Sequence, residues 1–114
     1  MTSSGDSRDV FAFPILIGDI GGTNARFAVV DGPTSEASDP LIVQTASFTS
    51  IDEAIQSVVI EGAGLKPASA VIAVAGPVNG DEIPLTNCPW VVRPKQMFGS
   101  LGLSDIVVLN DFEA

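Results

Sequence analysis

A glycine-rich turn carries the first group of residues whose types and spacing could do chemistry. It reads Gly-Asp-Ile-Gly-Gly-Thr-Asn over residues 18–24 and follows an apolar run. Adjacent glycines let the backbone turn tightly and present bare N–H groups, which together form a concave site for an anion such as phosphate. Thr23 and Asn24 add side-chain donors, and Asp19 beside phosphates would serve a divalent cation or its waters.

Two familiar phosphate motifs do not fit this turn. No Gly-Lys-Ser/Thr follows it, so it is not a Walker loop. The Gly-x-Gly-x-x-Gly spacing is absent, and an apolar run at residues 25–31 follows instead of a helix, which excludes the dinucleotide fingerprint. A plain hairpin turn stays open as the alternative, with Asp19 bonding to its neighbours and Gly18 a small residue under a packed side chain.

Asn110 and Asp111 form the second candidate group. They follow the apolar run at residues 106–109, and ligands in open α/β sheets gather at the carboxyl ends of strands. A carboxylate there can accept a proton from a substrate hydroxyl, and an Asn amide can bond sugar hydroxyls. The structural alternative is that Asp111 caps a helix, because Asp is a preferred N-cap residue.

The elements that must position these groups are predicted from periodicity and turn signals. Strands are expected at residues 15–20, 25–31, 41–48, 68–75 (covered on both faces) and 105–109, and helices from Ser50 to Gly62 or Gly64 and over residues 94–101. Ser50 and Glu53 fit a capping box. Asn79-Gly80 predicts a small hairpin or flap within residues 76–85. The order favours a meander of three strands followed by helical crossovers to parallel strands, a mixed five-stranded α/β sheet.

Composition and charge exclude several classes of function. A chain of 114 residues with 46% apolar side chains is one small domain with a core. Five basic residues against 14 acidic ones give a net charge of −9, which argues against a nucleic-acid or anionic-membrane partner. The apolar runs are far shorter than the ~20 residues of a membrane helix. The absence of histidine excludes Ser-His and Cys-His catalysis and His-ligated metals within this chain.

Cysteine usage and the two ends of the chain add three expectations. Cys88 is the single cysteine and cannot form an internal disulfide, which fits a reducing cytoplasm. Residues 1–13 are predicted to be a disordered tail without a secretory signal. Residues 111–114 read as the first turn of a helix, so the sequence is interpreted as the N-terminal piece of a longer protein.

Four segments taken in order resemble the bacterial glucokinase family. They are GDIGGTNARFA at residues 18–28, AVAGPV at 73–78, LTNCPW at 85–90 and LNDFEA at 109–114. The resemblance covers essentially residues 14–114, and it implies an RNase H-like (actin-like ATPase) lobe, the small domain of a two-domain kinase. The second, larger domain would be missing from this chain. Trp90 is interpreted as a core residue and Cys88 as a small buried filler.

The resemblance also implies a reaction and the residues that serve it. The full-length protein would phosphorylate D-glucose with ATP and Mg²⁺ to glucose 6-phosphate at the start of glycolysis, whereas this fragment alone would be inactive. ATP binding would fall on Gly18, Asp19, Ile20, Gly21, Gly22, Thr23 and Asn24, with Asp19 reaching magnesium through water. Asp111 would be the general base, and Asn110 and Asn87 would bind the sugar. A homodimer is compatible with this reading.

Three alternatives stay open beside this reading. One is a kinase of another hexose or of an N-acyl hexosamine. Another is a non-catalytic module of the same fold that binds sugar or nucleotide, although the presence of both Asp19 and Asp111 argues against lost chemistry. A sugar-sensing repressor would need a DNA-binding domain before the glycine turn, and only 18 residues precede Asp19.

Overall fold

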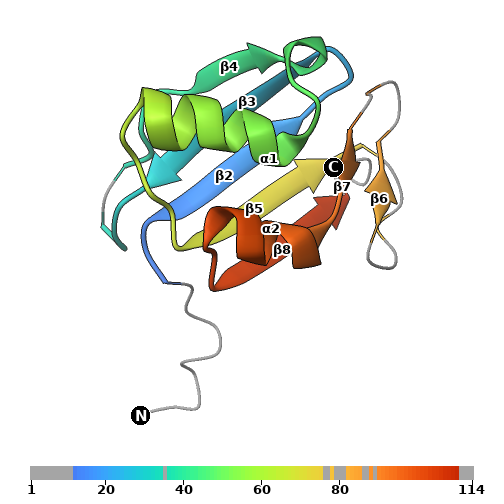
Figure 1. Ribbon diagram of the computed structural model, residues 1–114. Helices are drawn as coiled ribbons and strands as arrows, with labels where there is room; N and C mark the ends of the chain where they lie inside the picture. The colour runs from blue at the N-terminus through green and yellow to red at the C-terminus, as the bar shows by residue number, and fades with distance from the viewer. Residues whose placement is uncertain are drawn as a thin grey trace.

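A five-stranded mixed sheet forms the centre of the computed structural model (Figure 1). The structure describes residues 12–34, 36–75, 78, 82–85, 88 and 90–110. Its strands stand in the order β4-β3-β2-β5-β8. They are β2 (Ile15–Ile20), β3 (Asn24–Val30), β4 (Leu41–Gln44), β5 (Ser69–Val74) and β8 (Asp105–Asn110). β2, β3 and β4 pair antiparallel, and β5 and β8 continue the sheet parallel to β2. The predicted meander with added parallel strands is confirmed.

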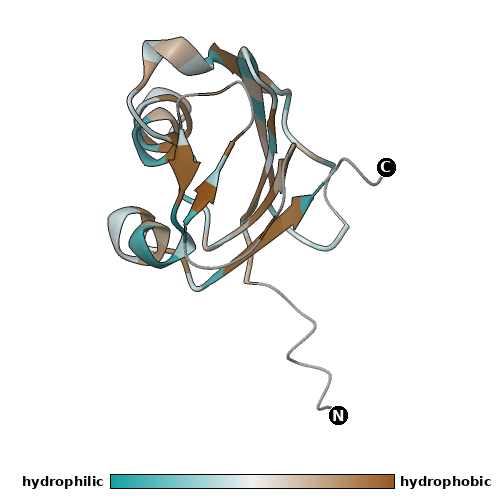
Figure 2. Cartoon of the chain, turned by 90° about the vertical axis from the view of Figure 1, so that its right-hand side faces the viewer, coloured by the Kyte–Doolittle hydropathy of each residue, from teal (hydrophilic) through white to brown (hydrophobic). Residues whose placement is uncertain are grey.

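The helices lie on one face of this sheet, as the side view shows (Figure 2). Helix α1 (Ile51–Ala54) continues directly into the π-helical η3 (Ile55–Gly62), and together they connect β4 to β5. Helix α2 (Pro94–Leu101) leads into β8 and ends at Gly102, whose φ of 68° is left-handed. The prediction of this second helix is confirmed, because Pro suits the first helical turn and Gly suits the left-handed cap.

A capping box fixes the start of α1, with one shift from the expected pattern. The Ser50 Oγ accepts a hydrogen bond from the Glu53 N–H at 3.1 Å. The Glu53 carboxylate reaches one residue further back than the common box and accepts from the N–H of Thr49 at 2.6 Å and from its hydroxyl at 2.9 Å. These bonds lower the pKa of Glu53, chiefly through the Thr49 backbone N–H.

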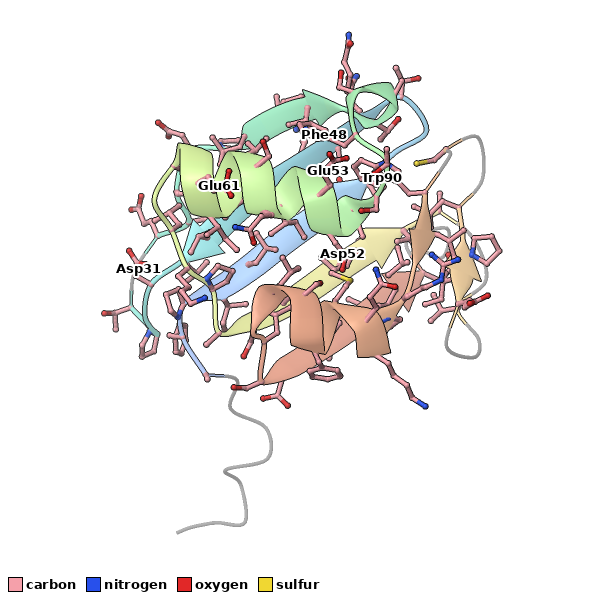
Figure 3. The ribbon with its side chains drawn as sticks, in the orientation of Figure 1. Asp31, Phe48, Asp52, Glu53, Glu61 and Trp90 are labelled. Atoms are coloured by element: carbon pink, nitrogen blue, oxygen red, sulfur yellow. The ribbon has the colours of Figure 1, made fainter. Side chains whose placement is uncertain are left out.

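The two helices are also tied to one another. The Ser100 hydroxyl on α2 donates a hydrogen bond at 2.5 Å to the carboxylate of Asp52 on α1. Figure 3 labels Asp52, which lies on the side of α1 that faces α2. Asp52 is 9% exposed, so this bond satisfies a nearly buried carboxylate. It holds α2, the element that leads into β8, against α1.

The core fills the space between the helices and the sheet. Its large buried side chains include Leu16, Phe27, Ile51, Ile55, Ile72, Trp90 and Met97. The other face of the sheet is partly open within the described residues, where Ile17 is 42% and Leu109 49% exposed. The prediction that both faces of β5 are covered is therefore wrong for this part of the chain, since Val71 and Ala73 are only half-buried.

The remaining predictions differ from the structure in detail. The third strand ends at Gln44, and a 3-10 turn, η2 (Thr45–Ser47), follows it. Asn79 and Gly80 lie outside the described residues; the observed short hairpin pairs β6 (Ile83–Pro84) with β7 (Val91–Val92). Residues 1–11 of the expected tail are also outside the described part. Within the described residues, no helix combines the length and apolar character needed to cross a membrane.

Candidate functional site

The carboxyl ends of the three parallel strands meet at one edge of the sheet. Ile20 at the end of β2 is in register with Val74 at the end of β5, and Val74 is in register with Asn110 at the end of β8. Neighbouring strands are about 4.8 Å apart, so β2 and β8 are roughly 10 Å apart here. The glycine turn follows Ile20 directly, and the fold therefore brings this turn and Asn110 to the same edge.

Asp19 lies one position before this row of strand ends. It is in register with Ala73 of β5 and stands directly opposite Arg26 of β3. Asp19 and Arg26 are both exposed, whereas Ile20 is buried on the helix-covered face at 2% exposure. The alternation of a strand thus puts the Asp19 carboxylate at the surface, one residue from the turn.

The glycine turn itself is a tight reversal between β2 and β3. The Gly21 N–H donates to the Asn24 carbonyl at 2.9 Å. A Cβ at Gly21 would lie 3.1 Å from that same oxygen, so a larger residue would crowd the turn. Among the described residues, neither the Gly22 N–H nor the Thr23 N–H donates to a backbone carbonyl. Two backbone donors at the tip of the turn are therefore available to an anion.

Thr45 contacts this turn, whereas the sequence pattern predicts that Thr45 lies inside the third strand. Its hydroxyl donates to the carbonyl oxygens of Gly22 at 2.9 Å and Thr23 at 3.1 Å, and its N–H donates to the Thr23 oxygen at 2.8 Å. These bonds end the β4 ladder at Gln44 and turn the chain into η2. Leu41 and Val43 alternate toward the core, and Thr45 continues this alternation. A hydroxyl that points inward needs a hydrogen-bond partner, so this pattern is the sequence signal for a contact made by Thr45.

Gly18 has a packing reason to be glycine. A Cβ at this position would lie 2.9 Å from Ile72 Cδ1 and 3.3 Å from the Phe27 ring. Gly18 sits in the middle of β2 on the covered face, and Ile20 is buried in the core. Their expected part in ATP binding stays a prediction.

Asp111 and Asn87, the expected base and second sugar ligand, lie outside the described residues. Asn110, which directly precedes Asp111 in the chain, is half-buried at the end of β8. Cys88 is half-buried and packs against the core, and Trp90 is 1% exposed, so both fit the structural roles expected of them.

The described residues fit a magnesium site of limited extent. No group of three or more His, Cys, Asp or Glu in that part of the chain is placed to hold a metal. Mg²⁺ is commonly held by one or two carboxylates, several waters and substrate phosphates, rather than by an all-protein cage. A single exposed Asp19 carboxylate next to the glycine turn is compatible with that mode, which needs the phosphates in place.

Comparison with known proteins gives a consistent result. The family model described as Glucokinase matches residues 16–114. A curated glucokinase from Mesorhizobium japonicum is 66% identical over 114 residues, 100% of this chain and 33% of that protein. The crystal structure of a glucokinase from an Antarctic psychrotroph matches 87% of this chain and 32% of its own chain, with 32% identity and a TM-score of 0.76.

A more distant structure shows the same fold. A ROK family glucokinase from Streptomyces griseus, solved in complex with glucose and AMPPNP, matches 86% of this chain and 33% of its own with 21% identity and a TM-score of 0.56. These likenesses confirm the expected actin-like ATPase lobe. The chain spans a third of the length of the curated relative from Mesorhizobium japonicum, 33%. By the family match over residues 16–114, the chain belongs to the glucokinase family.

Proposed function

We propose that the full-length protein transfers the γ-phosphoryl group of ATP to the 6-hydroxyl of D-glucose, giving glucose 6-phosphate and ADP. Family membership and the 66% identity to a named glucokinase support this reaction. The structural observation that supports it is the common row of Ile20, Val74 and Asn110, which brings the glycine turn and the Asn110 amide to one edge of the sheet.

The nucleotide half of the site is proposed to be the glycine turn. The chain has a net charge of −9, so its overall field repels a polyphosphate, and local backbone donors must hold it. The Gly22 and Thr23 N–H groups and the exposed Thr23 and Asn24 side chains supply such donors. Asp19 is proposed to hold Mg²⁺ through water, and the ion when bound would neutralise charge on the phosphates.

The sugar half is proposed to lie at the end of β8. Asn110 and Asn87 would bond sugar hydroxyls, and Asp111 would orient the 6-hydroxyl and accept its proton as the bond to phosphorus forms. Phosphoryl transfer needs little covalent help from the protein, so alignment of the hydroxyl with the phosphate supplies most of the rate. The two halves are separated by roughly 10 Å at the sheet, the width of the intervening strand β5, so substrate and nucleotide would meet above the carboxyl end of β5.

The finer features of the proposal follow from its substrates. ATP and glucose place the protein in the cytoplasm at the start of glycolysis, and a further, larger domain would complete the adenosine and sugar contacts. The 114-residue chain by itself is then expected to release no ADP in the presence of ATP and glucose. A homodimer is the oligomeric state that we propose for the full-length protein, and light scattering measures it.

The test is a coupled assay of glucose 6-phosphate formation by the purified full-length protein with its D111N and D105N variants. Asp105 is the first residue of β8, and Asp111 comes directly after β8 in the chain, so the two substitutions are chemically the same and differ in their position relative to this strand. We expect D111N to lower kcat by ~100-fold or more with unchanged nucleotide affinity, and D105N to stay within ~2-fold of wild type.

Near-normal turnover by D111N would remove Asp111 as the base. Wild-type protein that ignores glucose but phosphorylates another hexose or an N-acyl hexosamine in the same assay would replace the substrate and keep the reaction. Protein that binds nucleotide and phosphorylates none of these sugars would favour the non-catalytic module.

A further inference from the structure

We infer that Thr45 is a positioning residue for the nucleotide phosphates: its hydroxyl fixes the glycine turn so that backbone N–H groups at the tip face the ligand. The inference rests on the proposed function, since it takes the turn to be the phosphate site. Thr45 itself belongs to η2, after β4, and lies 22 and 23 positions from the two residues whose carbonyls it contacts.

Three hydrogen bonds join Thr45 to the tip of the turn. The hydroxyl lies 2.9 Å from the Gly22 oxygen and 3.1 Å from the Thr23 oxygen, and its single hydrogen is shared between them. The backbone N–H of Thr45 donates to the Thr23 oxygen at 2.8 Å. The Thr23 carbonyl therefore keeps a partner without the hydroxyl, whereas the Gly22 carbonyl depends on the hydroxyl alone among the described residues.

The geometry of the peptide bond links this contact to the ligand. In a planar trans peptide the C=O of one residue and the N–H of the next point in opposite directions. The bond from Thr45 to the Gly22 oxygen thus turns the Thr23 N–H away from Thr45. β4 and Thr45 lie on the far side of β3 from β5 and β8, so a donor that faces away from Thr45 faces the side of the sheet where Asn110 lies.

The burial of Thr45 makes its hydroxyl depend on hydrogen-bond partners within the protein. Thr45 is 2% exposed, and a buried hydroxyl without a partner is costly. The two turn carbonyls satisfy it, and in return they are held in one orientation. Without the hydroxyl, the Gly22–Thr23 peptide can rotate. Phosphate binding must then order this peptide, which weakens the net binding free energy.

The experiment compares three variants of the full-length protein. T45V keeps the shape and removes the hydroxyl, T45S keeps the hydroxyl, and T49V is the matched control. Thr49 is also a threonine that donates from its hydroxyl, but its acceptor is Glu53 at 2.9 Å and not the turn. Readouts are the Kd for AMPPNP by calorimetry, KM for ATP and for glucose, kcat, and the thermal midpoint.

We expect T45V to raise the Kd for AMPPNP and the KM for ATP by ~3- to 10-fold, the range that one neutral hydrogen bond supplies, while the KM for glucose changes by less than ~2-fold. T45S should restore nucleotide affinity to within ~2-fold of wild type. T49V should leave both constants unchanged. If Thr45 had a purely structural role, T45V would lower the thermal midpoint and would not raise the KM for ATP more than the KM for glucose.

The outcomes separate the inference from the proposed function. T45V with wild-type affinity for AMPPNP, in a protein that still phosphorylates glucose, overturns the role of Thr45 and leaves the kinase intact. Wild-type protein that binds no AMPPNP overturns both. If T45V does not fold, the amide resonances of the wild type decide: the Thr23 N–H must shift when AMPPNP is added, and an unshifted Thr23 resonance in a protein that binds AMPPNP refutes the inference.

Discussion

The indole Nε1–H of Trp90 donates a hydrogen bond to the carbonyl oxygen of Phe48 at 3.0 Å, across 42 positions of sequence (Figure 3). This bond joins the end of the β6–β7 hairpin to the segment that leads into α1. Trp90 is 1% exposed, so its large ring fills the core while its one polar group is satisfied. The contact anchors Trp90, which follows the expected sugar ligand Asn87 by three positions in the chain, to the segment before α1.

The Trp90–Phe48 bond predicts a cost for W90F. Phenylalanine keeps an aromatic ring but leaves the Phe48 carbonyl without its donor and leaves a space beside it. We expect the free energy of unfolding to fall by about 1 to 3 kcal/mol. Urea unfolding of the full-length protein followed by circular dichroism measures it. F98L on α2 is the control, because Phe98 is 40% exposed, and an equal loss in F98L would contradict the assignment.

The position of Gly18 predicts a steric cost for G18A. The added Cβ would lie 2.9 Å from Ile72 Cδ1 and 3.3 Å from the Phe27 ring, so the end of the Ile72 side chain must move within the packed core, at about 1 kcal/mol. G99A is the control: Gly99 lies in α2 with no atom within 4 Å of its added Cβ, and alanine there should stabilise the helix by about 0.5 to 1 kcal/mol.

A double variant identifies the clash at Gly18. I72V removes Cδ1, so the cost of G18A should be smaller in the I72V background than in wild type. Equal costs in the two backgrounds would show that Ile72 is not the obstacle. Urea unfolding measures the loss of unfolding free energy that G18A causes in wild type and in I72V, and these two losses are compared.

The hydrogen bonds to Glu53 predict a pH dependence of stability. They lower its pKa below the ordinary value of 4.5, so the charged form is favoured in the folded state. The contribution is complete above that ordinary value and is lost as the pH falls through the lowered pKa. The difference in urea midpoint between wild type and E53Q should therefore be largest near neutral pH and should narrow below pH 4.5.

The control for this pH series is E36Q. Glu36 is exposed in the loop between β3 and β4, and its substitution removes one charge without touching α1. A difference from wild type that follows pH in the same way for E36Q and E53Q would show that net charge, and not the capping bonds, produces the effect.

Local chemistry made most of the secondary structure predictable. Helix α2 matched the predicted residues 94–101 because Pro94 and Gly102 act on the backbone of their own turn. The capping box was found from Ser50 and Glu53 for the same reason, although the carboxylate bonds to Thr49, one residue before the common partner. The third strand was predicted too long, because the bonds that end it come from a turn more than 20 positions earlier.

The features of the candidate site also fall into those that the sequence indicates and those that only the tertiary structure shows. Residue type and position after a strand made the glycine turn, Asp19 and Asn110 candidates, whereas the registers of β2, β5 and β8 in the structure showed that the turn and Asn110 share an edge. The clamp of Thr45 on Gly22 and Thr23, the packing of Gly18 under Ile72 and the anchor of Trp90 on Phe48 were decided by the tertiary structure. Each joins segments distant in sequence, and a local pattern carries no information about which distant carbonyl or side chain a buried group will meet.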